Sequence, residues 1–222
     1  MVIPADLPAL VAPVAWMLGT WEGWGMHANP AAPGQEASAE APADSPVVEE
    51  IRGDVVGEQM CLVTRVYAGE SAAPIDPTWN AAQGLAAIKK GDLISEETVY
   101  VSVAPSDAPL PPPGQYNARE FTATSASTEG HSAVWDGVSV GPRVQMVSDA
   151  IALGVDAPRL THVGRMFGLV AGELMWTQER TLDGQDEADV EISGRLHRTE
   201  QASTESGEVI DGIDDSQGGF LV

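Results

Sequence analysis

The seven residues 19–25, with the sequence GTWEGWG, constrain the fold of this chain more than any other stretch. Three glycines make a helix unfavourable here, because each one costs about 1 kcal/mol relative to alanine in a helix interior. In a strand, successive side chains point to opposite faces, so one face would carry Gly19, Trp21, Gly23 and Gly25. Glycine inside a strand marks a bend or a close approach of another backbone. We therefore predict that this stretch is the first strand of a closed sheet, with Trp21 filling one end.

The chain has 222 residues, 43% of them hydrophobic, which is enough for one core in one all-β barrel. About ten strand-like segments follow one another with no long helix between them, and this order favours an antiparallel up-and-down barrel over any βαβ fold. An apolar segment at 6–17, with Asp6 as its N-cap, predicts a short helix that covers the barrel mouth. The strands are expected at 19–25, 47–52, 60–68, 96–103, 117–125, 131–136, 141–148, 159–168, 172–181 and 188–198.

This barrel domain is expected to span residues 1–198. Three segments rich in Ala, Gly, Pro and acidic residues are predicted to be mobile loops, because they offer little apolar surface to bury. They are residues 28–46, 69–92 and 104–114. The acidic, glycine-rich residues 199–222 are predicted to form a disordered tail.

The formal net charge is −22, from 11 basic and 33 acidic residues. Such a surface repels phosphate backbones, so neither nucleic acid nor an anionic membrane is expected as a partner, and a protein partner stays open. The single cysteine, Cys61, excludes an internal disulfide and is compatible with a reducing compartment. With no basic leader and no apolar run of about 20 residues, a cytoplasmic location is expected.

The glycine and tryptophan pattern fits G-x-W-x-G-x-G and resembles the signature of the nitrobindin family. The apolar residues 7–18 before it are similar to that family's short lead-in helix. The resemblance implies a ten-stranded barrel of the fatty-acid-binding-protein type that binds ferric haem through a histidine on the last strand. It also implies the family's haem-dependent activities, which are peroxynitrite isomerisation and nitric oxide binding.

The last predicted strand departs from this family at one position. The run 191–198, EISGRLHR, resembles the family's ligand motif through Leu196 and Arg198, and this register puts Glu191 where the family has the haem-ligating histidine. Imidazole is a good axial ligand for haem iron, whereas glutamate is a hard anionic oxygen donor. We therefore expect that family-type haem ligation is lost and that no cofactor is held. Because a carboxylate in an apolar barrel is costly unless it is paired or protonated, Glu191 is expected to line a hydrated cavity or to contact an arginine.

The four histidines give little support for another ligand site. His162 lies in a predicted strand and is the candidate substitute haem ligand, with an ordinary barrel histidine as the alternative. His197 is expected at the barrel rim, while His27 and His131 border a loop and a turn. No pair has metal-ligand spacing, so no metal site is expected.

Sequence motifs of the common enzyme classes, such as G-x-S-x-G, the Walker loop and G-x-G-x-x-G, do not occur in the chain. The acidic pairs at 49–50 and 96–97 are interpreted as solvated, since neighbours on a strand face opposite ways. Three functions therefore stay open. The preferred one is binding of a small apolar or amphipathic ligand in the barrel, without catalysis. The others are a haem protein of the peroxynitrite isomerase or nitric oxide-binding kind and a non-catalytic interaction scaffold.

Overall fold

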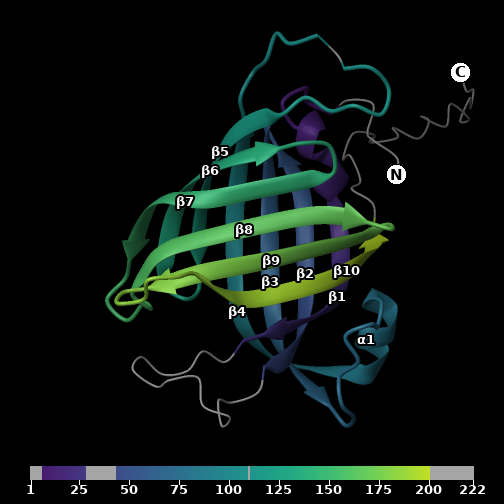
Figure 1. Ribbon diagram of the computed structural model, residues 1–222, viewed down its shortest axis with the longest axis vertical. Coiled ribbons are helices and arrows are strands. Elements are labelled where there is room, and N and C mark those ends of the chain that lie inside the picture. The colour runs from purple at the N-terminus through teal and green to yellow at the C-terminus, as the bar shows by residue number, and fades with distance from the viewer. Residues whose placement is uncertain (1–6, 29–43, 110, 201–222) are drawn as a thin grey trace, which may run out of the picture.

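The structure of the protein is a computed structural model that describes residues 7–28, 44–109 and 111–200 (Figure 1). Ten antiparallel strands form a closed barrel in chain order, and β1 closes it by pairing with both β2 and β10. This confirms the predicted all-β barrel. The strands are β1 (Gly19–His27), β2 (Ser45–Val56), β3 (Gln59–Ser71), β4 (Ile88–Val103), β5 (Arg119–Ser127), β6 (His131–Ser139), β7 (Arg143–Leu153), β8 (Leu160–Val170), β9 (Glu173–Leu182) and β10 (Asp189–Glu200).

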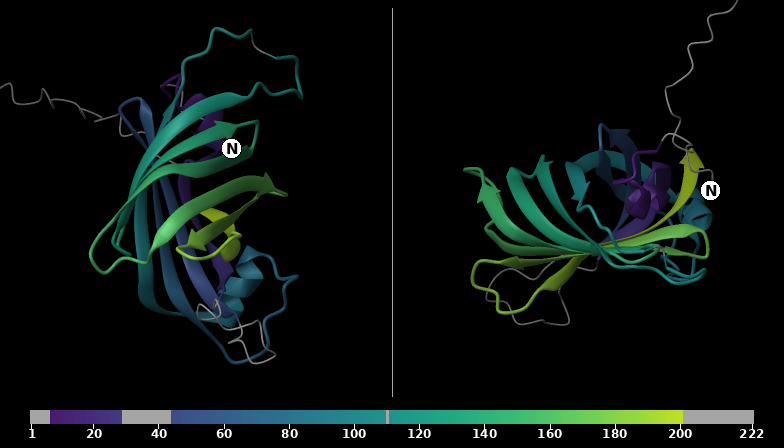
Figure 2. Two further views of the ribbon diagram at one scale, coloured as in Figure 1. Left: turned by 60° about the vertical axis from the view of Figure 1, so that its left-hand side comes forward. Right: turned by 90° about the horizontal axis from the view of Figure 1, so that it is seen from above.

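The two halves of the chain form opposite sides of the barrel wall (Figure 2). The long strands β2 to β4 lie on one side, and β8 to β10 curve across the other. The inward faces carry most of the buried hydrophobic residues, and these form one main core cluster. In the described part of the chain, no helix is both long and apolar enough to cross a membrane.

One end of the barrel is closed by a short 3-10 helix, η1 (Ala12–Met17), which is the expected helix in a shorter form. Asp6, its expected N-cap, lies outside the described residues. The indole Nε1 of Trp21 donates a hydrogen bond to the carbonyl oxygen of Met17 at 3.0 Å. The guanidinium of Arg198 lies 4.0 Å above the Trp21 ring and donates to the carbonyl oxygens of Trp16 and Leu18. The apolar core is thereby sealed at this end.

Two glycines of the signature allow β1 and β10 to approach closely. A Cβ atom built on Gly23 would overlap the backbone of Arg195, and one built on Gly25 would overlap the carbonyl oxygen of Ser193. Any side chain at either position would push the two strands apart. The signature therefore serves the closure of the barrel, where the first and last strands meet.

The prediction of one loop over 69–92 is wrong. Strand β3 continues to Ser71, helix α1 (Ala81–Ala87) follows, and β4 begins at Ile88. Helix α1 starts with a capping box: Asn80 Oδ1 accepts from the Gln83 amide, and Gln83 Oε1 accepts from the Asn80 amide, each at 2.9 Å. The helix packs on the outside of the barrel, where Gly84 lies directly against the Trp24 ring.

The other predicted loops and the tail agree with the structure only in part. Strand β2 begins at Ser45, inside the segment 28–46, and residues 29–43 lie outside the described part. The described residues of 104–114 contain neither helix nor strand. Strand β10 continues to Glu200, two residues beyond the predicted barrel end, and residues 201–222 are not described.

Candidate functional site

A small polar cavity lies inside the barrel at the end away from η1, where β1 reaches His27. Its volume is about 40 Å³. Side chains from several strands surround it, with imidazole, carboxylate, guanidinium and hydroxyl groups among them. They include Thr64, Glu97, His131, Arg165 and Glu191.

Arg165 is the cation at the centre of this cavity wall. It lies on β8 between the buried Val163 and Phe167, so the alternation of the strand points it inward. Its Nη2 is 2.5 Å from Glu97 Oε2 on β4, and its Nε donates to Gln178 Oε1 on β9 at 3.0 Å. Its guanidinium carbon is 5.1 and 5.6 Å from the rings of Trp135 and Trp176. Charge, hydrogen bonds and aromatic rings together fix its position.

Glu191 reaches the same cavity from an irregular position on β10. The register of β10 against β9 shifts between Val190 and Ile192, and both Glu191 and Ile192 are buried. This is the pattern of a β-bulge, in which an extra residue re-aims a side chain. The carboxylate accepts a hydrogen bond from Gln178 Nε2 at 2.8 Å and forms an ion pair with Arg180. Arg180 thus makes the arginine contact expected from the sequence.

His27 and Glu129 are further neighbours of Glu191. His27 Nε2 is 3.8 Å from Glu191 Oε1. Burial, followed by the nearby Glu191 carboxylate, raises the pKa of Glu129 above its usual range. Arg165 and Arg180 therefore lie among several carboxylates that compete for their positive charge.

Four buried polar atoms around the cavity have no hydrogen-bond partner in the described part of the chain. They are Thr64 Oγ1, Glu97 Oε1, His131 Nδ1 and Arg165 Nη1. A buried polar atom left unpaired costs about 1 to 3 kcal/mol, so such atoms are normally satisfied by protein or by ordered water. A space of this size suits a few waters or one very small polar molecule. The arrangement can therefore bind hydrogen-bonding groups.

Glu49 is a third buried acid, located between the polar cavity and the sealed end. It is fully buried on β2 and accepts a hydrogen bond from Trp176 Nε1 at 2.8 Å. Its carboxylate packs against Gly25 and Gly194, where an added Cβ would collide with it. Burial raises the pKa of Glu49 to about 8, so the side chain is protonated at neutral pH.

The interpretation of both acidic pairs as solvated is wrong for one member of each pair. Glu49 is 0% exposed and Glu97 is 8% exposed. Glu50 and Glu96 are less buried and pair with Lys90 and Arg65. Alternation along a strand necessarily turns one member inward when the other faces out. The sequence shows that the two members of each pair face opposite ways. It does not show which partners would stabilise the buried carboxylate.

The histidines are arranged differently from the sequence expectation. His162 is half-buried on β8, two positions from Gly164 and so on the opposite face from Arg165, and it is not among the residues that line the polar cavity. His27 and His131 do line that cavity. The signal for His27 was present, because the inward positions 19, 21, 23 and 25 continue to 27. Within the described ranges, no three His, Cys, Asp or Glu side chains are arranged to hold a metal ion.

Comparison with known proteins agrees with this barrel. A family model described as the THAP4-like, haem-binding β-barrel domain matches residues 10–198. A ferric nitrobindin-like protein of Beutenbergia cavernae is 31% identical over 88% of this chain and 97% of its own. A protein of Renibacterium salmoninarum named peroxynitrite isomerase is 25% identical over 93% of this chain and 96% of its own.

A solved structure shows the same fold. The crystal structure of Rv2717c from M. tuberculosis superposes with a TM-score of 0.58 at 18% identity, covering 87% of this chain and 99% of that one. The match of the family model begins before η1 and ends at residue 198 within β10, so it reaches every strand of the barrel. This chain therefore belongs to the family of THAP4-like, haem-binding β-barrel domains, the nitrobindin family.

Proposed function

We propose that this chain is a nitrobindin-family barrel that does not hold haem through its last strand and that binds a small polar ligand in the cavity between Arg165 and Glu191. The observation that carries this proposal is the state of Glu191. Its carboxylate is already engaged by Arg180 and Gln178. The resemblance of the last strand to the family motif implies that the haem-ligating histidine would stand at this position. Glutamate supplies no imidazole nitrogen, and its charge is neutralised by the neighbouring arginine.

The residues of the barrel interior do not fit a haem group. The polar cavity measures about 40 Å³, and a second interior cavity, lined by apolar side chains and Arg165, measures about 10 Å³. Pockets for drug-sized ligands begin at about 300 Å³, and a porphyrin is at least that large. Two imidazoles, His27 and His131, are present, but the Glu97, Arg165 and Gln178 network fills the space beside them.

The small volumes of the two interior cavities also limit the chemical class of the ligand. An apolar or amphipathic ligand inside the barrel, as expected from the sequence, would have to displace packed core side chains. The polar cavity instead presents unpaired donor and acceptor atoms from Thr64, Glu97, His131 and Arg165. A molecule of a few non-hydrogen atoms that both donates and accepts hydrogen bonds matches these atoms. The location proposed for this binding activity is the cytoplasm, in line with the single cysteine.

A haem-dependent activity is the second candidate, because relatives carry the name peroxynitrite isomerase. The observation in its favour is the unpaired Nδ1 of His131 at the cavity wall. A non-catalytic scaffold would be the remaining alternative if neither haem nor a small ligand bound.

Titration with ferric haem, followed by the Soret absorption, tests the proposal. The unaltered protein should show no saturable Soret shift at one equivalent, whereas Glu191→His should gain one because it restores an imidazole at the proposed ligand position. Glu191→Gln is the matched control, since it removes the same charge without supplying an imidazole, and it should stay silent.

Two results would contradict the proposal. A saturable Soret shift in the unaltered protein that His131→Ala abolishes would show that His131 ligates the haem iron. A silent Glu191→His variant that keeps its fold by circular dichroism would remove the assignment of Glu191 to the ligand position.

A further inference from the structure

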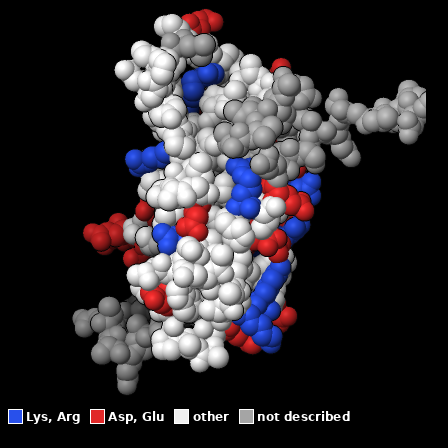
Figure 3. All heavy atoms as spheres, turned by 90° about the vertical axis from the view of Figure 1, so that its right-hand side faces the viewer, with Lys and Arg blue, Asp and Glu red and all other residues white. Residues whose placement is uncertain are grey.

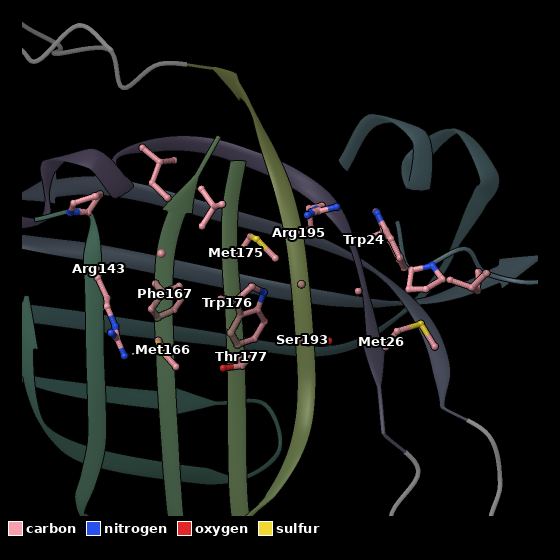
Figure 4. A pocket seen from close by; sticks show the side chains of 18 residues that line it. Trp24, Met26, Arg143, Met166, Phe167, Met175, Trp176, Thr177, Ser193 and Arg195 are labelled. Carbon is pink, nitrogen blue, oxygen red and sulfur yellow. Dashed lines mark hydrogen bonds between the residues drawn. The ribbon is translucent and has the colours of Figure 1, made fainter. Parts of the chain in front are cut away.

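A groove of about 790 Å³ lies on the outer face of the barrel and is separate from the interior cavity. It crosses β8, β9, β10 and β1, and it is bounded by residues 75–77 on one side and by the start of β7 on the other. Figure 4 shows the side chains of the lining residues across these strands, from Arg143 on β7 to Trp24 on β1, together with the buried rings of Phe167 and Trp176. The volume lies within the range of about 300 to 1,000 Å³ that is typical of small-molecule sites.

The walls of this outer groove are mainly apolar. Met26, Met166 and Met175 contribute flexible, polarisable side chains, and Trp24 and Ile75 add a ring and a branched chain. Methionine-rich surfaces adapt to ligands of differing shape. The side of the molecule that carries α1 and the ends of β1, β9 and β10 has wide uncharged areas between its charged side chains (Figure 3).

The charged residues that line the groove are both basic. Its 18 lining residues include Arg143 and Arg195 and no aspartate or glutamate, although acidic residues outnumber basic ones 33 to 11 in the chain. The Glu173 carboxylate beside the groove already pairs with Arg195, whereas Arg143 forms no ion pair with a carboxylate of the described residues, so an anion is favoured at the Arg143 end. The net negative charge elsewhere acts weakly at the groove, because charges more than about 8 Å apart in water are largely screened at physiological salt.

Arg143 is the residue available to meet that anion. Within the described residues, seven of the eleven basic side chains form an ion pair with a carboxylate, and Arg195 is one of them through Glu173. Arg143 is not among the seven. Its Nη2 donates to the sulfur of Met166, at 3.2 Å, so the cation borders the apolar wall directly.

We propose that the outer groove binds a single-chain amphipathic carboxylate, with its apolar chain along the three methionines and its carboxylate at Arg143. An arginine forms charge-assisted hydrogen bonds with a carboxylate, often two at once. The apolar chain would cover the adjoining side chains, at about 25 cal/mol per Å² of apolar surface removed from water. This site is distinct from the interior cavity, so a test of it is independent of the proposal about haem.

Gly168 offers a direct way to block the groove. A Cβ built there meets only the carbonyl oxygen of Pro142, at 4.0 Å, so a larger side chain would enter the groove without disturbing the barrel core. The matched control is Ser132→Leu, which adds the same side chain at an exposed position on β6 that lines none of the cavities or grooves described.

Isothermal titration with dodecanoate, below its micelle concentration, measures the binding. The unaltered protein and Ser132→Leu should bind one equivalent with the same affinity, whereas Gly168→Leu should weaken binding by about tenfold or more. Arg143→Gln should weaken dodecanoate binding by about tenfold but change binding of the uncharged dodecanol by less than about twofold, because only the carboxylate needs the guanidinium.

Several outcomes would overturn this proposal. Absence of binding to the unaltered protein, or equal binding by Gly168→Leu, would remove the ligand from the groove. A stable dimer in sedimentation that only Gly168→Leu dissociates would assign the groove to a second copy of the chain. Hydrogen-exchange protection of residues 201–222 that Gly168→Leu abolishes would assign it to the chain's own tail.

Discussion

The two ends of the barrel interior each contain a buried or half-buried arginine, and the two arginines have different partners. At the sealed end, Arg198 donates to the carbonyl oxygens of Trp16 and Leu18 and lies over Trp21, so it meets neutral groups. At the polar end, Arg165 meets the carboxylate of Glu97 and keeps an unpaired nitrogen beside a cavity. The first arrangement holds strands together, while the second leaves bonding capacity for a ligand.

Glu49 lies between these two ends, and its ionisation should have the largest effect on stability. Burial raises its pKa from 4.5 to about 8. Because the folded state holds this proton more tightly than the unfolded state, the stability that Glu49 contributes is complete below about pH 4.5 and is lost as the pH rises to about 8. The full loss corresponds to about 5 kcal/mol.

Glu49→Gln removes this titration while keeping an oxygen that can accept from Trp176. We expect the variant and the unaltered protein to have similar free energies of unfolding near pH 4, and the variant to be more stable by as much as about 5 kcal/mol above pH 8. Urea unfolding at several pH values measures the difference. Parallel curves for the two proteins would show that Glu49 ionises normally in the fold.

Removing the cation of the polar end should have the next largest effect. Arg165→Met leaves the Glu97 carboxylate buried without its partner, and breaking a buried pair in this way costs about 3 to 5 kcal/mol. The double variant Arg165→Met with Glu97→Gln should recover much of this loss, since no buried charge then remains. If the single and double variants unfolded at the same urea concentration, the pair would not be the source of the cost.

Removing the cation of the sealed end should have the smallest effect. Arg198→Met loses two charge-assisted hydrogen bonds but leaves no buried charge without a partner. We therefore expect the free energy of unfolding to fall by about 2 kcal/mol. The thermal midpoint measures it, with Arg52→Met as a control because Arg52 is an exposed residue of β2. If Arg198→Met lost more stability than Arg165→Met, the cation of the sealed end would matter more to the fold than that of the polar end, contrary to our expectation.

Much of the barrel was readable from local patterns. Alternation and glycine placement in residues 19–25 predicted the first strand, and the turn-separated segments predicted ten strands in an antiparallel order. The helix within 69–92 was missed because its capping box, Asn80 to Gln83, stands in a stretch of weak apolar content. Its stability comes from packing on Trp24, which lies 60 residues away from Gly84 in the chain.

The candidate site was only partly readable, for a related reason. Glu191 was identified from its place in the last strand, and the need for an arginine partner followed from the cost of a buried carboxylate. Its partners Arg180 and Gln178 lie on β9, and Arg165 lies on β8, so they meet at the cavity only once the sheet has closed. A pattern of period two tells which way a residue faces, but not what faces it from another strand.

The sequence by itself determined the barrel, its strand order and its family kinship, because hydrophobic alternation and glycine positions act within a strand or between neighbouring strands. Only the tertiary structure decided which acids are buried, how far the interior is filled, and that the larger apolar space lies outside the barrel. These properties depend on side chains that come together from distant strands. Glu49 can be buried because Trp176 donates to it, and Glu97 because Arg165 pairs with it. Neither partner can be identified from the local sequence around the acid.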